Sequence, residues 1–203
     1  NEITDKLIFD KIKYFIEPNT IVLDLGANFG QMSILWSKSK PNVKVYAFEA
    51  SNYIFNILKK NIHINSANVE AINALVGKES NKEQLIEKSF LKEYSTYGTN
   101  KINKTQDTNK KNIDKVKAIK IDDINFEKRV SVMKIDVQGY DLDALKGSKK
   151  TILKHKMPII FEYEEKFEKE FNYTFKDFEN FINEINYKIE TKIDEINYLI
   201  IPK

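Results

Sequence analysis

The sequence predicts an α/β fold in which a mostly parallel sheet is covered by crossover helices. Three observations predict it: short apolar runs alternate with amphipathic segments, a glycine-containing turn follows the first apolar run, and two strand-like runs with a short turn end the chain. Strands that alternate with helical segments are typical of parallel sheets. The 203 residues suffice for one domain with a sizeable core, and no repeat or second domain is visible. We therefore expect a single domain over residues 1–203.

The first part of the chain contains three predicted helices, each followed by a predicted strand. An N-terminal helix is expected within residues 1–18, where apolar side chains recur at helical spacing and Thr4 is the candidate N-cap. Further helices are expected around residues 31–37 and after Ser51, a second candidate N-cap. The predicted strands are residues 20–25, 43–48 and 69–76.

The second part begins with a segment of weak periodicity. Residues 78–117 contain a long polar stretch, and we expect a loop or lid insertion there, with a short strand near residues 84–90. A helix is expected from Leu142 to a break at Gly147, and another after Thr174. The remaining predicted strands are residues 116–121, 130–137, 158–162 and a C-terminal antiparallel hairpin of residues 187–191 and 198–201.

Composition disfavours several classes of protein. The net charge is only +3, and of 33 basic residues only Arg129 is an arginine, so a nucleic-acid partner is not expected. The absence of cysteine removes disulfide frameworks and thiolate zinc sites, and we assign no metal site. No apolar run approaches the ~20 residues that span a bilayer, so no membrane span is expected. The expected location is the cytoplasm.

The strongest functional signal is the run VLDLGANFG at residues 22–30. It follows a predicted strand and opens a helix, which is the context of a nucleotide-binding loop. Gly26 permits a tight turn and close approach of a ligand, and free N–H groups at the helix start favour an anion. Asn28 stands where dinucleotide-binding loops have the glycine that admits a pyrophosphate. This disfavours NAD and favours S-adenosylmethionine (SAM), whose ammonium group suits Asp24.

Glu49 strengthens the cofactor hypothesis. It ends the second predicted strand, where the nucleotide-binding arrangement places an acid that reaches the ribose hydroxyls. A carboxylate accepts two hydroxyl hydrogens, which a neutral side chain of that length rarely matches.

Three blocks of sequence resemble the FkbM-type methyltransferases. They are residues 22–30, residues 45–49 with 61–77, and MKIDVQGYD at residues 133–141 through LKG at 145–147. With residues 159–162 the resemblance spans roughly residues 20–165. It implies a Rossmann-like class I methyltransferase fold of about seven strands, the last antiparallel. It also implies SAM as cofactor and methyl transfer usually to oxygen, on glycans or natural products.

The resemblance assigns roles to individual positions. The SAM loop matches Asp24, Gly26, Asn28 and Gly30. Glu49 matches the ribose-binding acid, the segment near adenine matches Asn73 and Ala74, and Asp136 matches the aspartate beside the sulfonium. Gln138 departs from the pattern, because the family commonly has glutamate there. If that glutamate is a base or metal ligand, this chain lacks it, since an amide accepts no proton and binds hard cations weakly.

The candidate catalytic groups lie at the carboxyl ends of the predicted strands, where open α/β sheets place their sites. Methyl transfer needs alignment, and a sugar hydroxyl needs a general base. Asp136 is the first choice, Glu162 the second and Glu164 a third. Asp136 has two other readings, as a cap of the following helix or as the partner of the methionine ammonium. His63 and His155 are expected to be structural or exposed.

The leading functional hypothesis is O-methylation of a hydroxyl on a carbohydrate or glycan precursor. Tyr94 and Tyr97 are candidates to stack on a sugar ring of a small-molecule or glycan acceptor. Two alternatives remain: a SAM-binding module without catalysis, which Gln138 favours, and a NAD-dependent oxidoreductase, which rests on the strand–helix plan alone.

Overall fold

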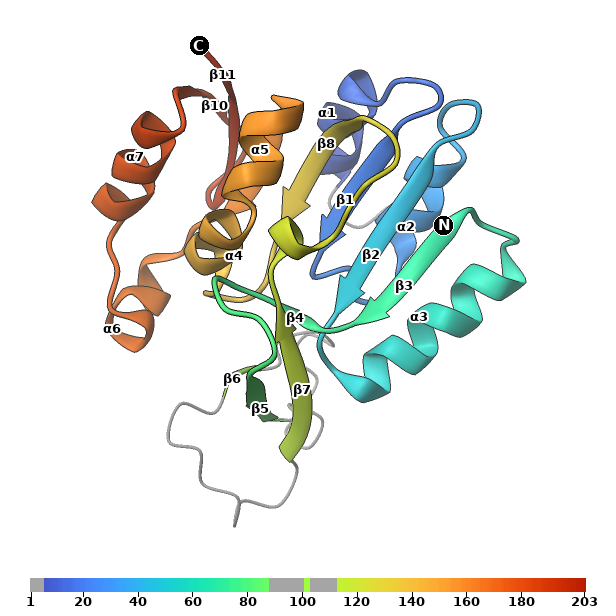
Figure 1. Ribbon diagram of the computed structural model, residues 1–203, viewed down its shortest axis with the longest axis horizontal. Helices are drawn as coiled ribbons and strands as arrows, with labels where there is room; N and C mark the ends of the chain where they lie inside the picture. Colours follow the sequence, from blue (N-terminus) through green and yellow to red (C-terminus); the bar gives the residue numbers. More distant parts are fainter. Residues whose placement is uncertain (1–5, 88–100, 103–112) are drawn as a thin grey trace.

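The computed structural model describes residues 6–87, 101–102 and 113–203. Thr4, Tyr94 and Tyr97 lie outside these residues. The described chain forms one large sheet covered by helices on both faces, with a small second sheet beyond one of its edges (Figure 1). None of the described helices is long and apolar enough to cross a bilayer.

The large sheet has seven strands, in the order β10-β11-β9-β8-β1-β2-β3. Strands β9, β8, β1, β2 and β3 run parallel, whereas β11 is antiparallel to both β9 and β10. The predicted fold class and its C-terminal hairpin are therefore confirmed. The strands are β1 (Ile21–Leu25), β2 (Lys44–Glu49), β3 (Val69–Asn73), β8 (Val130–Ile135), β9 (Ile159–Glu162), β10 (Tyr187–Lys192) and β11 (Asn197–Pro202).

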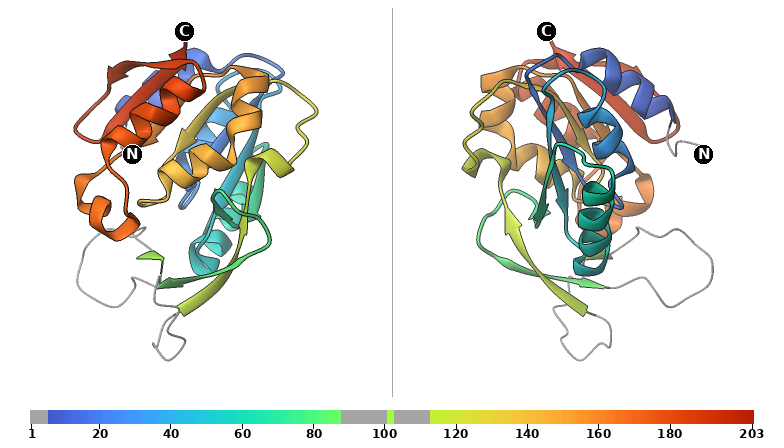
Figure 2. Two further views of the ribbon diagram at one scale, coloured as in Figure 1. Left: turned by 60° about the vertical axis from the view of Figure 1, so that its left-hand side comes forward. Right: turned by 90° about the vertical axis from the view of Figure 1, so that its right-hand side faces the viewer.

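Helices cover both faces of this sheet (Figure 2). One face carries α1 (Lys6–Phe15), α2 (Gln31–Ser37) and α3 (Asn52–Ile64). The other carries α4 (Asp141–Gly147), α5 (Lys149–His155) and α7 (Phe175–Glu184); the shorter segments are η1 (Ile121–Asp123), η2 (Glu165–Phe167) and α6 (Glu168–Phe171). Two predicted boundaries are confirmed: the Ser51 side chain accepts the N–H of Ile54, and α4 ends at Gly147.

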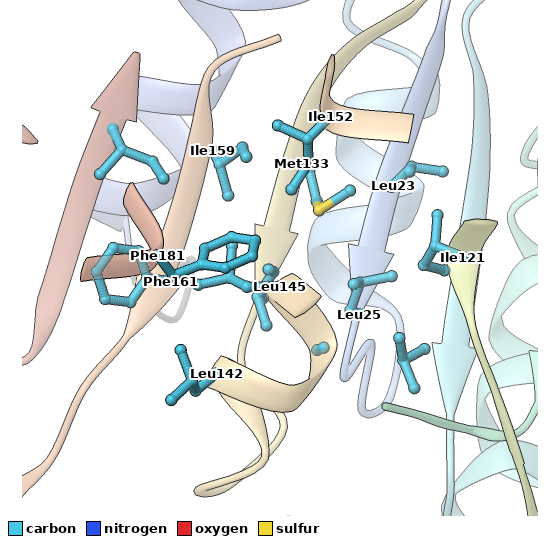
Figure 3. Close-up of a cluster of buried hydrophobic side chains, with 14 of the residues drawn as sticks. Leu23, Leu25, Ile121, Met133, Leu142, Leu145, Ile152, Ile159, Phe161 and Phe181 are labelled. Carbon is cyan, nitrogen blue, oxygen red and sulfur yellow. The ribbon is translucent and has the colours of Figure 1, made fainter. Parts of the chain in front are cut away.

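The core follows from the alternation of side chains along the central strands. In β1, Leu23 and Leu25 face the helices α4, α5 and α7, where they join a cluster with Met133 of β8 and Leu145 of α4 (Figure 3). Val22 points to the opposite face and packs with α1 and α2. Both faces of these strands are buried, which explains their continuous apolar runs. Charged residues inside such strands are therefore conspicuous.

The small sheet corrects two predictions. It has the order β4-β7-β5-β6, formed by β4 (Leu75–Val76), β7 (Ile113–Ile119), β5 (Glu83–Glu87) and β6 (Lys101–Ile102). The single strand predicted for residues 69–76 is wrong, because the chain leaves the large sheet at Ala74 and Leu75 pairs with Ala118 instead. The short strand expected near residues 84–90 corresponds to β5, and the strand expected from residue 116 corresponds to the second half of β7. The loop predicted for residues 78–117 is wrong at β6 and at residues 113–115, where β7 begins earlier than expected.

The small sheet lies beyond the carboxyl ends of β1 and β2 (Figure 1). The chain leaves the small sheet after β7, and Asp122 in η1 connects this segment to α5 of the large sheet's helical layer. The Asp122 carboxylate accepts the backbone N–H groups of Lys150, at 2.9 Å, and Thr151, at 2.8 Å, in the first turn of α5. These bonds satisfy amides that a helix start leaves without a partner. Asp122 thus caps α5 from a distant part of the chain.

Replacing Asp122 tests this cap. We expect Asp122→Ala to lower the free energy of unfolding by about 1 kcal/mol, the usual cost of losing a capping side chain. Urea unfolding measures the change, with the exposed Glu127→Ala as the matched control. Equal stability of the two variants would show that Asp122 does not hold α5.

Candidate functional site

A cavity of about 230 Å³ opens at the carboxyl ends of β1 and β8. Its walls are residues 26–32 together with Asp24, Lys134 and Asp136. Four of the residues predicted from the cofactor loop line it, namely Asp24, Gly26, Asn28 and Gly30. The other predicted site residues, Glu49, Asn73, Ala74 and Glu162, are outside this lining.

Gly26 closes the loop against the neighbouring strand. Its φ is +83°, and an added Cβ would lie 1.8 Å from the carbonyl oxygen of Asp136. The sequence interpretation assigned this glycine to close approach of a ligand. In the structure the close neighbour of Gly26 is the backbone at the end of β8, and close approach of a ligand to this glycine stays a prediction.

The backbone N–H groups of the loop are engaged by the protein. The amides of Gly26 and Ala27 both donate to the carbonyl oxygen of Phe48, and the amide of Asn28 donates to the Glu49 carboxylate at 3.0 Å. These three amides are therefore not available to an anion, and the anion site expected at the start of α2 stays a prediction. They instead tie the loop to the end of β2.

Glu49 is the centre of that connection. Its second carboxylate oxygen accepts the N–H of Ser51 at 2.8 Å. Burial raises the pKa of Glu49, and the two N–H donors oppose the rise. Asn73 connects the end of β3 to the same hydrogen-bond network, because its side-chain amide donates to the carbonyl oxygens of Glu49 and Ala50. Contacts of Glu49 with ribose, and of Asn73 and Ala74 with adenine, stay predictions.

A buried charge network lies below the loop. Asp24 of β1 and Lys134 of β8 are paired in register across the two parallel strands, and both are buried. The Lys134 ammonium donates to the carbonyl oxygen of Gly26 at 3.2 Å and to the Asp136 carboxylate at 3.1 Å, and it lies 3.7 Å from Oδ1 of Asp24. The other Asp24 oxygen accepts the hydroxyl of Ser33. Sequence reasoning assigned no role to Lys134. The feature that could have revealed it is a lysine inside an otherwise apolar predicted strand.

Electrostatics hold the members of this network in defined protonation states. Burial disfavours the Lys134 ammonium, yet the carboxylates of Asp136 and Asp24 outweigh burial and hold its pKa well above its usual range. Burial raises the pKa of Asp24, against the lowering effect of Lys134 and Ser33. For Asp136 burial is outweighed by Lys134 and by hydrogen bonds, so its pKa is lowered.

Glu162 at the end of β9 completes the network. Its carboxyl group lies beside Asp136, because the preceding residues Phe161 and Ile135 are paired in register across β9 and β8. Burial and the negative charge of Asp136 raise the pKa of Glu162 to about 11, so that Glu162 carries the proton and Asp136 the charge at neutral pH. The first and second catalytic candidates, Asp136 and Glu162, are thus brought together by the fold. Glu164, the third candidate, is ion-paired with Lys166.

The turn after β8 positions Asp136 from the other side. Gln138, at φ +50°, donates its side-chain amide to Oδ1 of Asp136 at 3.1 Å. Asp141 accepts the N–H groups of Val137, at 3.4 Å, and Gly139, at 3.1 Å, and burial raises its pKa to about 7. The side chain that braces this turn is therefore Asp141, which sequence reasoning missed.

The two histidines lie away from the cavity. His63 is exposed on α3. His155 accepts the N–H of Val130 at 3.2 Å, at the start of β8 and so at the opposite edge of the sheet. Neither is brought to the site, as expected. Within residues 6–87 and 113–203 no group of three or more His, Asp or Glu side chains has the arrangement of a metal site.

Comparison with known proteins identifies the family. The model of the methyltransferase FkbM domain matches residues 24–189, so the chain belongs to the FkbM methyltransferase family. The chain is 25% identical over 166 residues to "Methyltransferase 1" of Beauveria bassiana (strain ARSEF 2860), covering 72% of this chain and 66% of that protein. The family resemblance drawn from the sequence is confirmed.

Solved structures share the fold. Methyltransferase FkbM from Methylobacillus flagellatus KT superposes with a TM-score of 0.57 at 18% identity, covering 91% of this chain and 44% of that chain. A TehB-like SAM-dependent methyltransferase from Corynebacterium glutamicum gives 0.56 at 10% identity, covering 100% of this chain and 89% of that chain. This chain therefore spans less than half of the first structure and about two thirds of the curated relative.

Family membership decides the cofactor in favour of SAM over NAD. The cavity fits that molecule in one respect that the structure itself displays. Oδ1 of Asp24 is buried and has no hydrogen-bond donor among the described residues, so it can accept one from the methionine ammonium, directly or through water. Gly26 and Asn28 form the wall beside it.

Replacing Gly26 tests the packing of the loop. We expect Gly26→Ala to destabilise the fold by about 3 kcal/mol or more, because a Cβ there meets backbone at a positive φ. Urea unfolding measures it. Gly77→Ala is the matched control, since its Cβ would meet only the Tyr140 ring at 3.6 Å. A Gly26→Ala protein as stable as the control would contradict the described packing.

The protonation of Glu162 predicts a pH dependence of stability. Between the ordinary pKa of 4.5 and the raised value of about 11, the folded protein binds a proton at Glu162 that the unfolded chain has lost. The free energy of unfolding therefore falls as pH rises, by about 1.4 kcal/mol per pH unit from this group. Glu162→Gln removes this contribution while keeping a donor to Asp136.

Urea unfolding between about pH 6 and pH 8 measures this slope. The unfolding free energy of Glu162→Gln should depend less steeply on pH than that of the wild type. Glu165→Gln, an exposed carboxyl in the same segment, should keep the wild-type slope. Parallel slopes for all three proteins would mean that Glu162 is ionised like any surface carboxyl.

Proposed function

We propose that the chain catalyses methyl transfer from SAM to a hydroxyl oxygen of a carbohydrate or glycan precursor. The observation that carries the proposal is the position of Asp136, which lines the cofactor cavity and stands beside Glu162 at the end of β9. A hydroxyl acceptor must lose its proton during the reaction, and in our proposal the Asp136 carboxylate receives that proton. We place the reaction in the cytoplasm, where SAM is available.

The proposed chemistry assigns one step to the cofactor. Bound SAM supplies a methyl group on a sulfonium, so a C–O bond to the acceptor forms while the C–S bond breaks and its electron pair stays on sulfur. The protein's part is to align the acceptor oxygen and to receive its proton. Asp24 and Asn28 hold the donor, and Asp136 faces the reacting end of the cavity.

Asp136 is a weak base at rest, because Lys134 and Gln138 both donate to it. A weak base is sufficient here. As the new C–O bond forms, the acceptor oxygen becomes positive and its hydroxyl proton becomes strongly acidic. The proton then passes to the Asp136 carboxylate, and loss of the sulfonium charge from the neighbouring cavity favours the protonated pair.

The alternative proposal is a SAM-binding module without catalysis. Gln138 favours it, because its amide donates to Asp136 where the family commonly places glutamate. In our proposal the same amide orients Asp136, and Glu162 supplies the second carboxyl group. The two proposals agree on SAM binding and differ on turnover.

Calorimetry followed by methyl transfer tests the proposal. We expect SAM to bind, and radiolabelled methyl to pass to a hydroxyl in a panel of nucleotide sugars and oligosaccharides. Asp136→Asn should lower kcat by about 10²-fold or more, the usual share of a general base. Glu165→Gln serves as the control and should retain full turnover.

Two results would contradict the proposed methyl transfer, and a third would contradict only the role of Asp136. Absence of SAM binding would exclude both the methyltransferase proposal and the alternative of a SAM-binding module without catalysis. Binding without transfer to any hydroxyl acceptor would favour the module. Full turnover of Asp136→Asn would remove that residue from the catalytic group while leaving methyl transfer in place.

A further inference from the structure

Lys134 is a buried cation in a strand whose other residues are buried and uncharged. Burying an ammonium group is costly unless its charge and its hydrogens are compensated. The compensation comes from one carbonyl oxygen and two carboxylates, at Gly26, Asp136 and Asp24. Each of these three partners also lines the cofactor cavity.

The position of Lys134 links the two ends of the cavity. Gly26 belongs to the loop, and Asp136 lies past the end of β8 at the reacting end of our proposed site. The ammonium bonds to both, and its third neighbour is Asp24, the residue with a buried oxygen left for a ligand. The titratable groups that face Lys134 from the surrounding elements are Asp24 of β1, Glu49 of β2, Asp136 after β8 and Glu162 of β9.

The charges of Asp24, Asp136 and Lys134 suggest what this arrangement does. Two buried carboxylates as close as Asp24 and Asp136 disfavour each other's ionisation, and without a cation they would take up a proton. SAM carries two positive groups and one carboxylate, so it needs the cavity in its ionised form. A cation fixed behind the carboxylates keeps them ionised before the cofactor arrives.

We propose that Lys134 is a positioning residue that keeps Asp24 and Asp136 ionised and fixed beside the cofactor cavity at neutral pH. It touches neither the acceptor nor the methyl group in this role and acts through the two carboxylates. The inference concerns the cofactor pocket, and it stands whichever acceptor the protein uses.

The test is the proton linkage of SAM binding, measured by calorimetry in buffers of different ionisation enthalpy between about pH 6 and pH 7.5. Relative to the wild type, Lys134→Met should release about one additional proton when SAM binds. As the pH is raised, the affinity of Lys134→Met for SAM should therefore increase more than that of the wild type does. The difference amounts to up to ~tenfold for each pH unit. Lys134→Arg keeps the charge and should behave as the wild type does.

Two further variants separate the charge from structural effects. Lys134→Met with Asp136→Asn removes both members of the main ion pair, so it should be more stable than Lys134→Met alone and should release no additional proton. The exposed Lys154→Met is the matched control and should leave proton release unchanged. If Lys134→Met fails to fold, rescue of folding by the added Asp136→Asn supports the inference.

The inference is overturned if Lys134→Met loses SAM affinity equally at every pH with no change in proton release. That result is expected if Lys134 only supports the fold of the cavity and does not affect the ionisation of Asp24 and Asp136. It is also overturned if Lys134→Met does not fold and Asp136→Asn does not rescue it. The failure of acceptor methylation would leave these binding measurements unaffected, so the two proposals fail separately.

Discussion

The ion pair between Lys134 and Asp136 is the contact on which the carboxyl edge of the sheet depends. Lys134 also bonds the carbonyl of Gly26, so that the end of β8 and the cofactor loop meet at one ammonium group. Asp136 in turn accepts a hydrogen bond from the Gln138 side-chain amide and lies beside Glu162 at the end of β9. The cofactor cavity and the proposed catalytic pair therefore share a single buried charge network.

Most of the large sheet could be predicted from sequence, because its strands are buried on both faces and are separated by helices with clear apolar faces. The strand of residues 20–25 was found on this basis. The C-terminal hairpin was found from two strand-like runs with a short turn between them, although β10 is mostly exposed. In the small sheet, β5 and the part of β7 from residue 116 were expected, whereas β6, residues 113–115 of β7 and the separation of β4 from β3 were missed. Strands β4 and β6 have only two residues each. Such strands are defined by their partners more than by their own sequence.

The candidate site was predictable where single residues have constrained conformations and was not where contacts cross between strands. Gly26 and Gly30 both adopt positive φ, and their spacing marked the loop. The engagement of the loop amides by Phe48 and Glu49 depends on the register of β1 against β2, which sequence alone does not supply. The pairing of Asp24 with Lys134 depends likewise on the register of β1 against β8.

The central claim is that one proton is held by Glu162 while Asp136 stays ionised. Carbon-13 NMR of the carboxyl groups, with assignments from Glu162→Gln and Asp136→Asn, tests it most directly. The account predicts that Glu162 remains protonated from about pH 5 to pH 8 while Asp136 remains ionised, in line with their raised and lowered pKa values. Titration of Glu162 together with the exposed glutamates, near its ordinary pKa of 4.5, would contradict it.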